Sequence, residues 1–482
     1  MVQNALKQAN QPQLEKPRKA AQLLAKTLNY PISGGRAANS GVVSLSYGLI
    51  CGSELGLGNI KHLINGMNFS LRKHLGLQRF SDKKYYKVLN MVLANLRRAH
   101  LEGCGLSIFT GHRQFDWNNP ERIRYTLPNN IIDYLADKGF IHVLRGNGSQ
   151  DIEHRSTTVC WPTAQLVALF EINRIKPLLH ARAELIELRH KVITYTAERV
   201  KVTRNKPVKI LKKDKKKADS LAEPVLIYNK LWLNHTPTLE GSYLIPWTKR
   251  VFNETLDYGG RFYGSFQQLS KQQRSKILID GFSTVEPDYS GYHINLLYTW
   301  QDEQLDLEED AYAIKGFSRD LVKAVMLPLL NCEKLSNLAG QITKSSKPEM
   351  KLYYERWQRK QAVYAQRVSL GLRSKQPKKK GYLKGFIEGI PEGTNGKEVI
   401  EAIKKKHPRI ARLFGTKDIG VKLQKQDSEI MAAVLCKLAV QGIPALPIHD
   451  SLRVKTINEL QVVEIMKSEY ERITGFKINV SK

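Results

Sequence analysis

Apolar and polar positions near the C-terminal end of the chain follow two different periods. Residues 428–438 carry apolar side chains at helical spacing, and Gly442 offers the left-handed conformation in which helices commonly end. Residues 445–448 and 452–454 are short apolar runs of the kind that form strands. The pattern therefore predicts a helix followed by a tight hairpin with Asp450 at its bend.

Capping signals frame this hairpin on both sides. Thr456 and Glu459 form a capping-box pattern that opens another helix, and Gly475 can close that helix. Asp427 and Ser428 stand just before the first helix, where either side chain is expected to serve as the N-cap. A structural role at these two positions is favoured over a catalytic one.

The N-terminal half has a mixed pattern. Residues 86–103 and 127–138 have helical apolar spacing, and a glycine follows the second segment. Residues 141–145 and 156–161 predict a hairpin around a glycine-rich turn. Residues 165–195 are then expected to be helical.

The helix and hairpin within residues 110–165 resemble the end of a winged helix. Arg145, His154 and Arg155 would make the wing basic and able to contact backbone phosphates. A small α+β domain without any DNA contact fits the same pattern. The sequence leaves both interpretations open.

The charge balance indicates a polyanionic partner. The chain has 482 residues with 76 Lys and Arg against 45 Asp and Glu, a formal charge of +31. Nucleic acid, the ribosome or an anionic membrane surface would explain such an excess. Nine basic residues fall between positions 200 and 217, which predicts a mobile linker or arm that can bind phosphates. A second basic block, residues 367–384, is expected to form a loop at the nucleic-acid face.

The cysteine pattern and the hydropathy of the chain indicate the cellular compartment in which the protein is expected. Five cysteines, an odd number without any C-x-x-C spacing, predict reduced thiols in a cytoplasm rather than disulfides or a zinc site. The sequence has no apolar run long enough to cross a bilayer and no signal-peptide pattern, so no membrane partner is expected.

Two aspartates occupy matched settings. Asp288 follows an apolar lead-in that begins at Val285, and Asp450 lies at the predicted bend. Two carboxylates on rigid strand ends can hold two divalent cations about 3.5–4 Å apart, an arrangement that serves phosphoryl transfer. A lone strand-end Asp is more often a solvated surface residue, so the interpretation depends on the residues around the pair.

Two further stretches suit nucleotide chemistry. Arg319 and Lys323 would project from one face of a helix, where a planar fork and a point charge fit a triphosphate. Residues 257–264 place three glycines around Arg261, which allows close approach of the backbone to a ligand. The ordinary alternatives are a solvated basic face and a glycine-rich turn.

Taken in chain order, these motifs resemble the palm and fingers of single-subunit polymerases. That superfamily joins family A DNA polymerases and the phage and mitochondrial single-subunit RNA polymerases. Asp288-Tyr289-Ser290 is similar to motif A of the DNA enzymes, and Arg319 and Lys323 match the start of motif B.

Two more matches extend the resemblance over residues 245–482. His449-Asp450-Ser451 is similar to motif C, with the Ser of the RNA enzymes where the DNA enzymes have Glu. Asp257, Gly260, Arg261 and Tyr263 match a template-contacting signature of the RNA enzymes.

The chain departs from the family where the sugar is usually selected. Asn331 stands where motif B normally has a Tyr, and Pro328 is expected to kink or end that helix. The DNA enzymes carry a Glu five residues after the motif A Asp, where it excludes the ribose 2′-hydroxyl. His293 stands there in this chain.

The resemblance implies a role for each matched residue. Asp288 and Asp450, helped by the Tyr289 carbonyl, would ligate two Mg²⁺ ions, with Mn²⁺ as a substitute. Lys323 would also protonate the pyrophosphate leaving group. The remaining roles are triphosphate binding by Arg319 and Lys323, template or hybrid contacts by Asp257, Arg261 and Tyr263, a primer or product 3′-end contact by His449, and a sugar and base pocket lined by His293 and Asn331.

The implied fold is α+β, with a right-hand polymerase palm and fingers at residues 241–482. A mainly helical DNA-binding region with a winged helix would occupy residues 1–195, and a basic linker would span 196–240. The expected activity is that of a DNA-directed DNA polymerase of a phage, plasmid or other mobile element, without a proofreading exonuclease. Its partners would be a DNA template, a primer or product duplex, and dNTP or NTP.

Other activities remain open. Residues 257–263, Ser451 and the missing Glu favour a DNA-directed RNA polymerase or primase of the same fold. A winged-helix replication initiator with an inactive polymerase-like half would share the charge. A two-Asp nuclease or transposase usually needs a third carboxylate. The sequence leaves the oligomeric state open.

Overall fold

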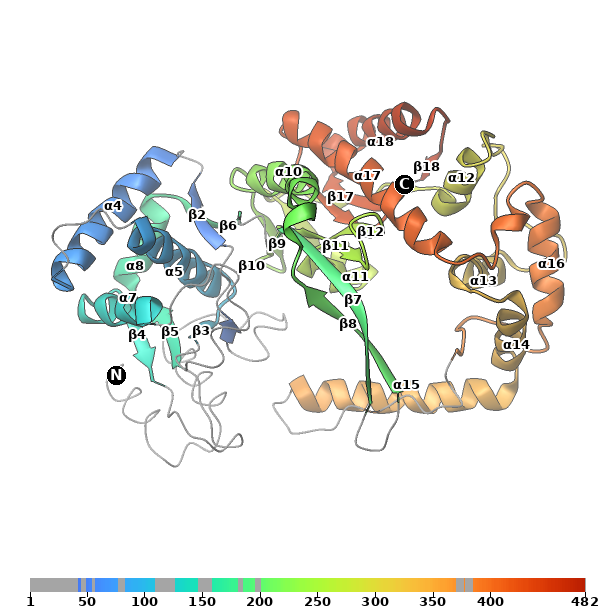
Figure 1. The fold of residues 1–482 in the computed structure, drawn as a ribbon, viewed down its shortest axis with the longest axis horizontal. Coiled ribbons are helices and arrows are strands. Elements are labelled where there is room, and N and C mark those ends of the chain that lie inside the picture. Colours follow the sequence, from blue (N-terminus) through green and yellow to red (C-terminus); the bar gives the residue numbers. More distant parts are fainter. Residues whose placement is uncertain are drawn as a thin grey trace.

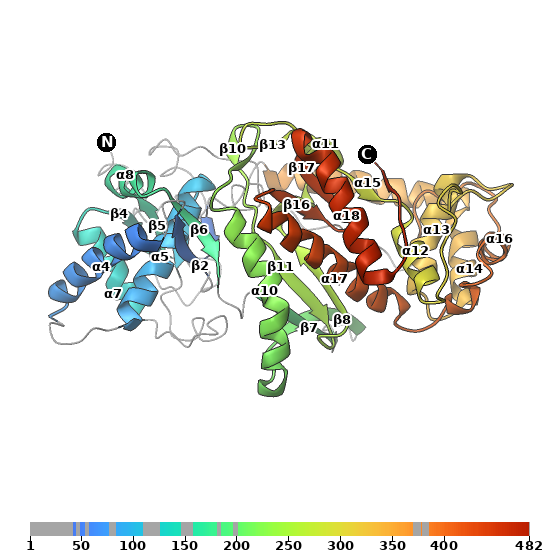
Figure 2. The same cartoon turned by 90° about the horizontal axis from the view of Figure 1, so that it is seen from above.

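A computed structural model describes residues 42–44, 49–53, 57–76, 83–108, 126–145, 158–180, 185–195, 201–369, 377 and 385–481. Helices and strands are mixed throughout these ranges, which confirms the expected α+β class. The elements up to β6 gather at one end, the strands around β12 and β17 lie in the middle, and α13, α14 and α16 lie at the other end (Figures 1 and 2).

The N-terminal part packs helices against two small sheets. One sheet has the strand order β1-β3-β5-β4, and the other pairs β2 with β6. The elements are β1 Val42–Ser44, β2 Leu49–Ser53, α4 Leu57–His74, α5 Lys83–Leu101, β3 Gly105–Ile108, α7 Thr126–Asp137, β4 Ile141–Leu144, β5 Thr158–Pro162, α8 Ala164–Ile172 and β6 Ile175–Leu179.

Several N-terminal expectations are confirmed. The two predicted helices appear as α5 and α7, Gly139 takes a φ of 72°, and β4 pairs antiparallel with β5. The side chain of Arg145 turns back to pair with Asp133. His154 and Arg155 lie outside the described residues, as does most of the basic block 367–384, so the wing itself stays a prediction.

A four-stranded sheet of order β12-β11-β7-β8 lies next in the chain. A three-stranded sheet has the order β10-β9-β13, and its strand β13 contacts β14 and β17. Their elements, with the helices between them, are β7 Ile186–Tyr195, β8 Lys201–Val208, α10 Lys215–Leu231, β9 Pro237–Leu239, β10 Ser242–Tyr243, β11 Lys249–Asn253, β12 Gly259–Tyr263, α11 Lys271–Arg274 and β13 Ile277–Ile279.

Two sequence expectations about this region are wrong. Residues 165–195 do not form one helix: α8 ends at Ile172, Pro177 interrupts helical hydrogen bonding, and Ile175–Leu179 and Ile186–Tyr195 pair as β6 and β7. The run 200–217, expected to be a linker, forms β8 from Lys201 and the start of α10. Pairing with β7 satisfies the backbone hydrogen bonds of β8, so this charged segment forms a strand and not a solvated linker.

The central sheet carries both aspartates. β17 pairs antiparallel with β16 on one side and with β14 and β15 on the other, and β15 also pairs with β18. Helices α17 and α18 pack on these strands and on each other (Figure 1). The strands are β14 Thr284–Val285, β15 Asp288–Tyr289, β16 Ala445–Ile448, β17 Ser451–Lys455 and β18 Val480–Ser481, and the helices are α17 Ile419–Val440 and α18 Glu459–Thr474.

The predicted hairpin and its flanking helices are confirmed, with corrected boundaries. α17 begins at Ile419, so Asp427 and Ser428 lie inside it and neither is its N-cap. Gly475 closes α18 with a φ of 79°. The capping box is absent at its start, because the Thr456 hydroxyl donates to the Ser283 carbonyl instead.

The remaining helices form a separate group beyond the central sheet. They are α12 Tyr292–Thr299, α13 Arg319–Asn331, α14 Leu335–Ser345, α15 Pro348–Ser369 and α16 Gly396–Lys406. α13 continues through Pro328 to Asn331, so the proline does not end it. No helix in the described ranges is both long enough and apolar enough to span a bilayer. All five cysteines are free thiols.

Candidate active site

The two aspartates meet where β15 lies beside the β16–β17 hairpin. The Cα atoms of Asp288 and Ser451 are direct cross-strand partners, and Asp450 immediately precedes Ser451. The Tyr289 backbone N–H donates to the Asp450 carbonyl at 3.5 Å. Ile448 pairs with Ser451, so the loop contains only His449 and Asp450. The sheet therefore fixes Asp288, on β15, beside the loop that carries Asp450.

The loop is held in an uncommon backbone conformation. His449 has a φ of 59°, in the left-handed region that residues other than Gly seldom enter, although Asn, Asp and His do so more often than the rest. Such strain persists only where the surrounding structure enforces it, and it occurs often at functional sites. Here the antiparallel ladder on both sides of the loop provides that enforcement.

The electrostatics of the pair suit a cation. Burial, the Asp450 carboxylate and the Glu286 carboxylate raise the pKa of Asp288 to about 7. The Oδ1 atom of Asp288 is buried and has no hydrogen-bond partner among the described residues. Two crowded carboxylates with an unsatisfied oxygen are a donor set that hard divalent cations such as Mg²⁺ prefer. The pair falls short of three clustered metal-ligating side chains, and no such trio occurs in the described part of the chain.

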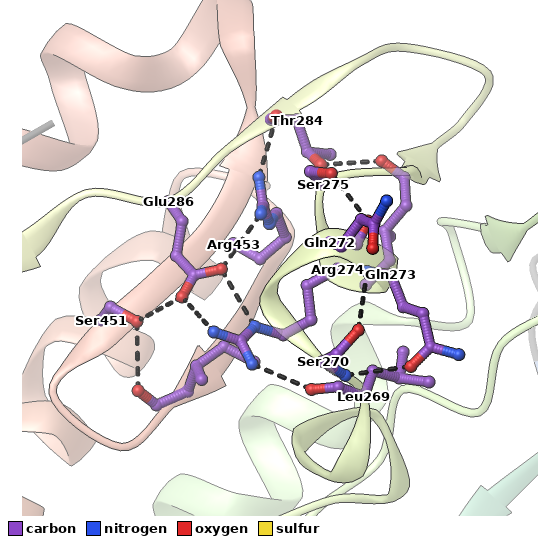
Figure 3. A network of polar contacts seen from close by, with 12 residues as sticks. Leu269, Ser270, Gln272, Gln273, Arg274, Ser275, Thr284, Glu286, Ser451 and Arg453 are labelled. Carbon is purple, nitrogen blue, oxygen red and sulfur yellow. Dashed lines mark hydrogen bonds and ion pairs between the residues drawn. The ribbon is translucent and has the colours of Figure 1, made fainter. Parts of the chain in front are cut away.

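Glu286, two residues before Asp288, serves a different purpose. Its carboxylate accepts hydrogen bonds from Arg274 at 2.9 and 3.1 Å and from the Ser451 hydroxyl at 3.2 Å, and it pairs with Arg453 at 3.0 Å (Figure 3). Burial opposes its ionisation, but Arg274 and Arg453 hold the pKa of Glu286 below its usual range. This network ties β14 to β17 and gives the strands behind the aspartates a fixed position.

Asp427 is a site residue that the sequence analysis misassigned. Its carboxylate is buried, accepts a hydrogen bond from Arg261 Nε at 2.8 Å, and lies 3.2 Å from His293 Nε2. Arg261 Nη2 also lies 2.9 Å from His293 Nε2. The predicted template residue and the predicted sugar-pocket residue are thus joined through one carboxylate on α17. No local motif marks this Asp, because its partners are far away in sequence.

The buried Arg250 extends this cluster. Its guanidinium donates to the Gly260 carbonyl at 2.7 Å and to the Ser428 hydroxyl at 2.9 Å. Ser428 is therefore an acceptor inside α17 for an arginine of β11. These bonds hold β12 against α17 and position Arg261, which follows Gly260.

Two aromatic rings meet at the aspartate loop. Tyr263 of β12 lies edge-on to His449, with 6.4 Å between the ring centroids. Tyr263 is partly exposed and faces the same loop as Asp450. Asp257, in contrast, is exposed and pairs with Lys217 of α10, so the structure separates it from the aspartate pair. Tyr289 has a buried ring whose hydroxyl donates to the Met466 carbonyl at 2.7 Å.

The two cations of α13 gather on the ring of Tyr312. Lys323 Nζ lies 5.3 Å from the Tyr312 ring centroid, and the Arg319 guanidinium carbon lies 5.4 Å from it. Burial and the Asp450 carboxylate raise the pKa of Tyr312 to about 12, and Lys323 acts on Asp288 in the opposite sense to Asp450. Tyr312 therefore contacts both cations and lies within electrostatic reach of the Asp450 and Asp288 carboxylates. It is the second site residue that no motif indicated.

Arg319 and Lys323 differ in how free they are. Arg319 pairs with Asp310. Burial opposes ionisation of Asp310, but the Arg319 guanidinium holds the pKa of Asp310 below its usual range. Lys323 is exposed and forms no ion pair within the described ranges. A polyphosphate would displace Asp310 from Arg319 but would find Lys323 available.

Asn331 lies several turns along α13 from Arg319. Its side-chain amide donates to the Leu327 carbonyl at 2.8 Å and packs against Gly420 of α17. It also lines a cavity of about 490 Å³ at the start of α14, with Cys332 and Asn337 among its neighbours. These contacts do not bring Asn331 to His293, the other residue expected in the sugar pocket.

Comparison with known protein families and curated sequences assigns no relative to this chain. No protein-family model and no curated protein sequence matches this chain.

Proposed function

We propose that this chain is a template-dependent nucleotidyltransferase with a right-hand polymerase core. The observation that carries the proposal is the position of Asp288 beside the Asp450 loop, with an unpartnered buried oxygen and a pKa raised by burial and by the neighbouring carboxylates. Lys323 and Arg319, gathered on Tyr312, support a polyphosphate substrate. The formal charge of +31 supports a nucleic-acid template.

Each residue of the candidate site would have its own role in nucleotide addition. Asp288 and Asp450, with the Tyr289 carbonyl, would hold two Mg²⁺ ions, which activate the attacking oxygen and stabilise the leaving oxygen when bound. Lys323 would contact the triphosphate and hold a proton for the pyrophosphate leaving group. Arg261 and Tyr263 would contact the template, and His449 the primer or product end.

Primer extension tests the proposal directly. A labelled primer on a DNA template is incubated with Mg²⁺ and either dNTPs or NTPs. Template-directed lengthening of the primer is the expected result. If neither nucleotide set gives extension with or without a primer, the proposed function is wrong.

DNA synthesis is the leading form of this activity, and RNA synthesis is the second candidate. Ser451 favours RNA synthesis, because a hydroxyl follows Asp450 where the DNA enzymes have a carboxylate. This hydroxyl donates a hydrogen bond to Glu286. His293, bonded to Arg261 and Asp427, likewise places an imidazole where a carboxylate would exclude ribose.

Weak sugar discrimination is therefore expected. A site that rejects a substrate through one clashing or unpaired polar group reaches roughly 10⁴–10⁵-fold selectivity. We expect the wild-type protein to discriminate between dNTP and NTP by less than this, and His293→Glu to increase the preference for dNTP. The measurement is kcat/KM for matched nucleotide pairs on one primer–template. His293→Gln, similar in size but uncharged, is the control, and an equal change in both variants would contradict the prediction.

Lys323→Ala should impair nucleotide use more than Arg319→Ala does. Lys323 is free to meet a polyphosphate, whereas Arg319 already has Asp310 as a partner. Loss of one charge-assisted contact should cost about 1.5–3 kcal/mol in kcat/KM for nucleotide. Template affinity should change little. Equal losses of template and nucleotide affinity would indicate a duplex-binding face instead.

A further inference from the structure

The β7–β8 pair continues well beyond the sheet to which it belongs. β7 and β8 pair from Leu188–Val208 out to Tyr195–Lys201, whereas β11 pairs with β7 only as far as Arg189. Beyond that point the described residues form a two-stranded ribbon with no third strand. Figure 1 shows the ribbon projecting away from α17 and α18.

The ribbon and the turn that follows it are strongly basic. Residues 186–195 and 201–217 contain eleven Lys and Arg against two acidic residues. One of the two, Glu187, already pairs with Arg189 and Lys249 at the base of the ribbon. The side chains of Lys191 and Lys206 are exposed, and neither forms an ion pair within the described ranges. The positive charge is therefore available to an outside partner.

The ribbon is continuous with the candidate active site. β12, which carries Arg261 and Tyr263, is the other edge strand of the same four-stranded sheet. Glu254, between β11 and β12, accepts a hydrogen bond from the Lys191 backbone N–H where the ribbon leaves the sheet. A nucleic acid held at Tyr263 therefore lies on the sheet from which the ribbon projects.

We propose that the β7–β8 ribbon binds a nucleic-acid duplex, with its lysines on the phosphates and its body in or along a groove. The major groove of a duplex is wide enough to admit a two-stranded ribbon, and basic side chains supply the sequence-independent part of such binding. Ile193 and Leu211 are exposed apolar side chains near these lysines and would lie against sugars or base edges. This inference names the binding element of the proposed activity and so rests on the proposed function.

The test compares two charge-reversal variants of the full-length protein. Lys191→Glu with Lys206→Glu alters the ribbon, and Lys437→Glu with Lys467→Glu makes the same change in net charge on α17 and α18. Lys437 and Lys467 are exposed. The probe is a fluorescent blunt DNA duplex roughly two helical turns long. Its Kd is measured over a series of salt concentrations without nucleotide.

The ribbon variant should bind the duplex roughly tenfold more weakly, and the slope of log K against log salt should fall by about 1.8, or about 0.9 for each lost phosphate contact. The control variant should keep both values. Equal losses in the two variants, or no loss in the ribbon variant, would overturn the inference. So would a larger loss for a single strand of the same length, or ribbon-dependent binding to phosphatidylserine vesicles without ribbon-dependent duplex binding.

The binding measurement does not depend on catalysis. If the wild-type protein fails to extend a primer but the ribbon variant alone loses duplex affinity, the proposed function fails and the ribbon assignment stands. If extension succeeds while both variants bind the duplex equally, the function stands and the ribbon assignment fails.

Discussion

Asp450→Asn and Asp288→Asn are each expected to lower nucleotide addition by roughly 10³-fold or more, which corresponds to about 4 kcal/mol of transition-state stabilisation. An amide keeps the size of the side chain but removes the charge that binds the cation. The measurement is single-turnover primer extension at saturating nucleotide. Duplex affinity and the circular-dichroism spectrum should be unchanged.

A matched control separates this loss from a general effect of removing an aspartate. Asp302 is exposed and has a φ of 57°, a conformation that Asn tolerates well. Asp302→Asn should therefore keep full activity. Substantial extension by either Asp288→Asn or Asp450→Asn would exclude the two-carboxylate mechanism.

The same substitution at Asp288 should stabilise the metal-free fold above neutral pH. The native carboxyl has a pKa of about 7 because burial and Asp450 disfavour its charge, whereas the usual value is 3.8. The native state therefore binds more protons than the unfolded state between these values, and stability falls as pH rises across that window. Asn carries no such penalty. Melting curves recorded in chelator at about pH 8, above this window, and at about pH 4, near its lower limit, should show a gain in melting temperature for Asp288→Asn at the higher pH and little at the lower.

Removing Asp427 is expected to produce the largest loss of stability among single substitutions at the site. Asp427→Ala would leave the buried Arg250 and the nearly buried Arg261 close together without their shared acidic neighbour. Loss of one partner from a buried ion pair typically costs about 3–5 kcal/mol. We expect a loss of this size in the free energy of unfolding measured in urea.

Activity should respond separately from stability. Asp427→Asn keeps an acceptor for Arg261 and should recover part of the stability, yet Arg261 and His293 would lose the charge that aligns them. The KM for nucleotide and the dNTP preference should therefore change even where the protein is fully folded. If Asp427→Asn matches the wild type in both values, Asp427 has only a structural role.

The sequence predicted the part of the site that is local. The hairpin around Asp450 follows from two short apolar runs with a polar pair between them, and each run supplies its own strand signal. The position of Asp288 beside this hairpin is not local, because β15 pairs with a strand far later in the chain, and it was expected only from the matched settings of the two aspartates. Arg319 and Lys323 share a helical face because their spacing of four residues fixes it.

The parts that depend on distant partners could not be predicted from the sequence. Asp427 resembles a helix cap until Arg261, far earlier in the chain, is seen to bind it. Tyr312 belongs to no motif and joins the site only because α13 packs beside it. The ribbon was missed for another reason: the lysine run in 201–217 obscured the alternation of β8, whose stability depends on pairing with β7.

The pairing of β15 with β18 sets the order in which the site can assemble. Asp288 lies opposite Ser481, and the Ser290 backbone N–H donates to the Asn479 carbonyl at 2.8 Å, so contacts that fix the first aspartate come from residues far later in the chain. During synthesis, the N-terminal part and the basic ribbon emerge and can fold long before residue 481 does. If the ribbon binds nucleic acid as proposed, a nascent chain would therefore acquire that affinity before the two aspartates are brought together.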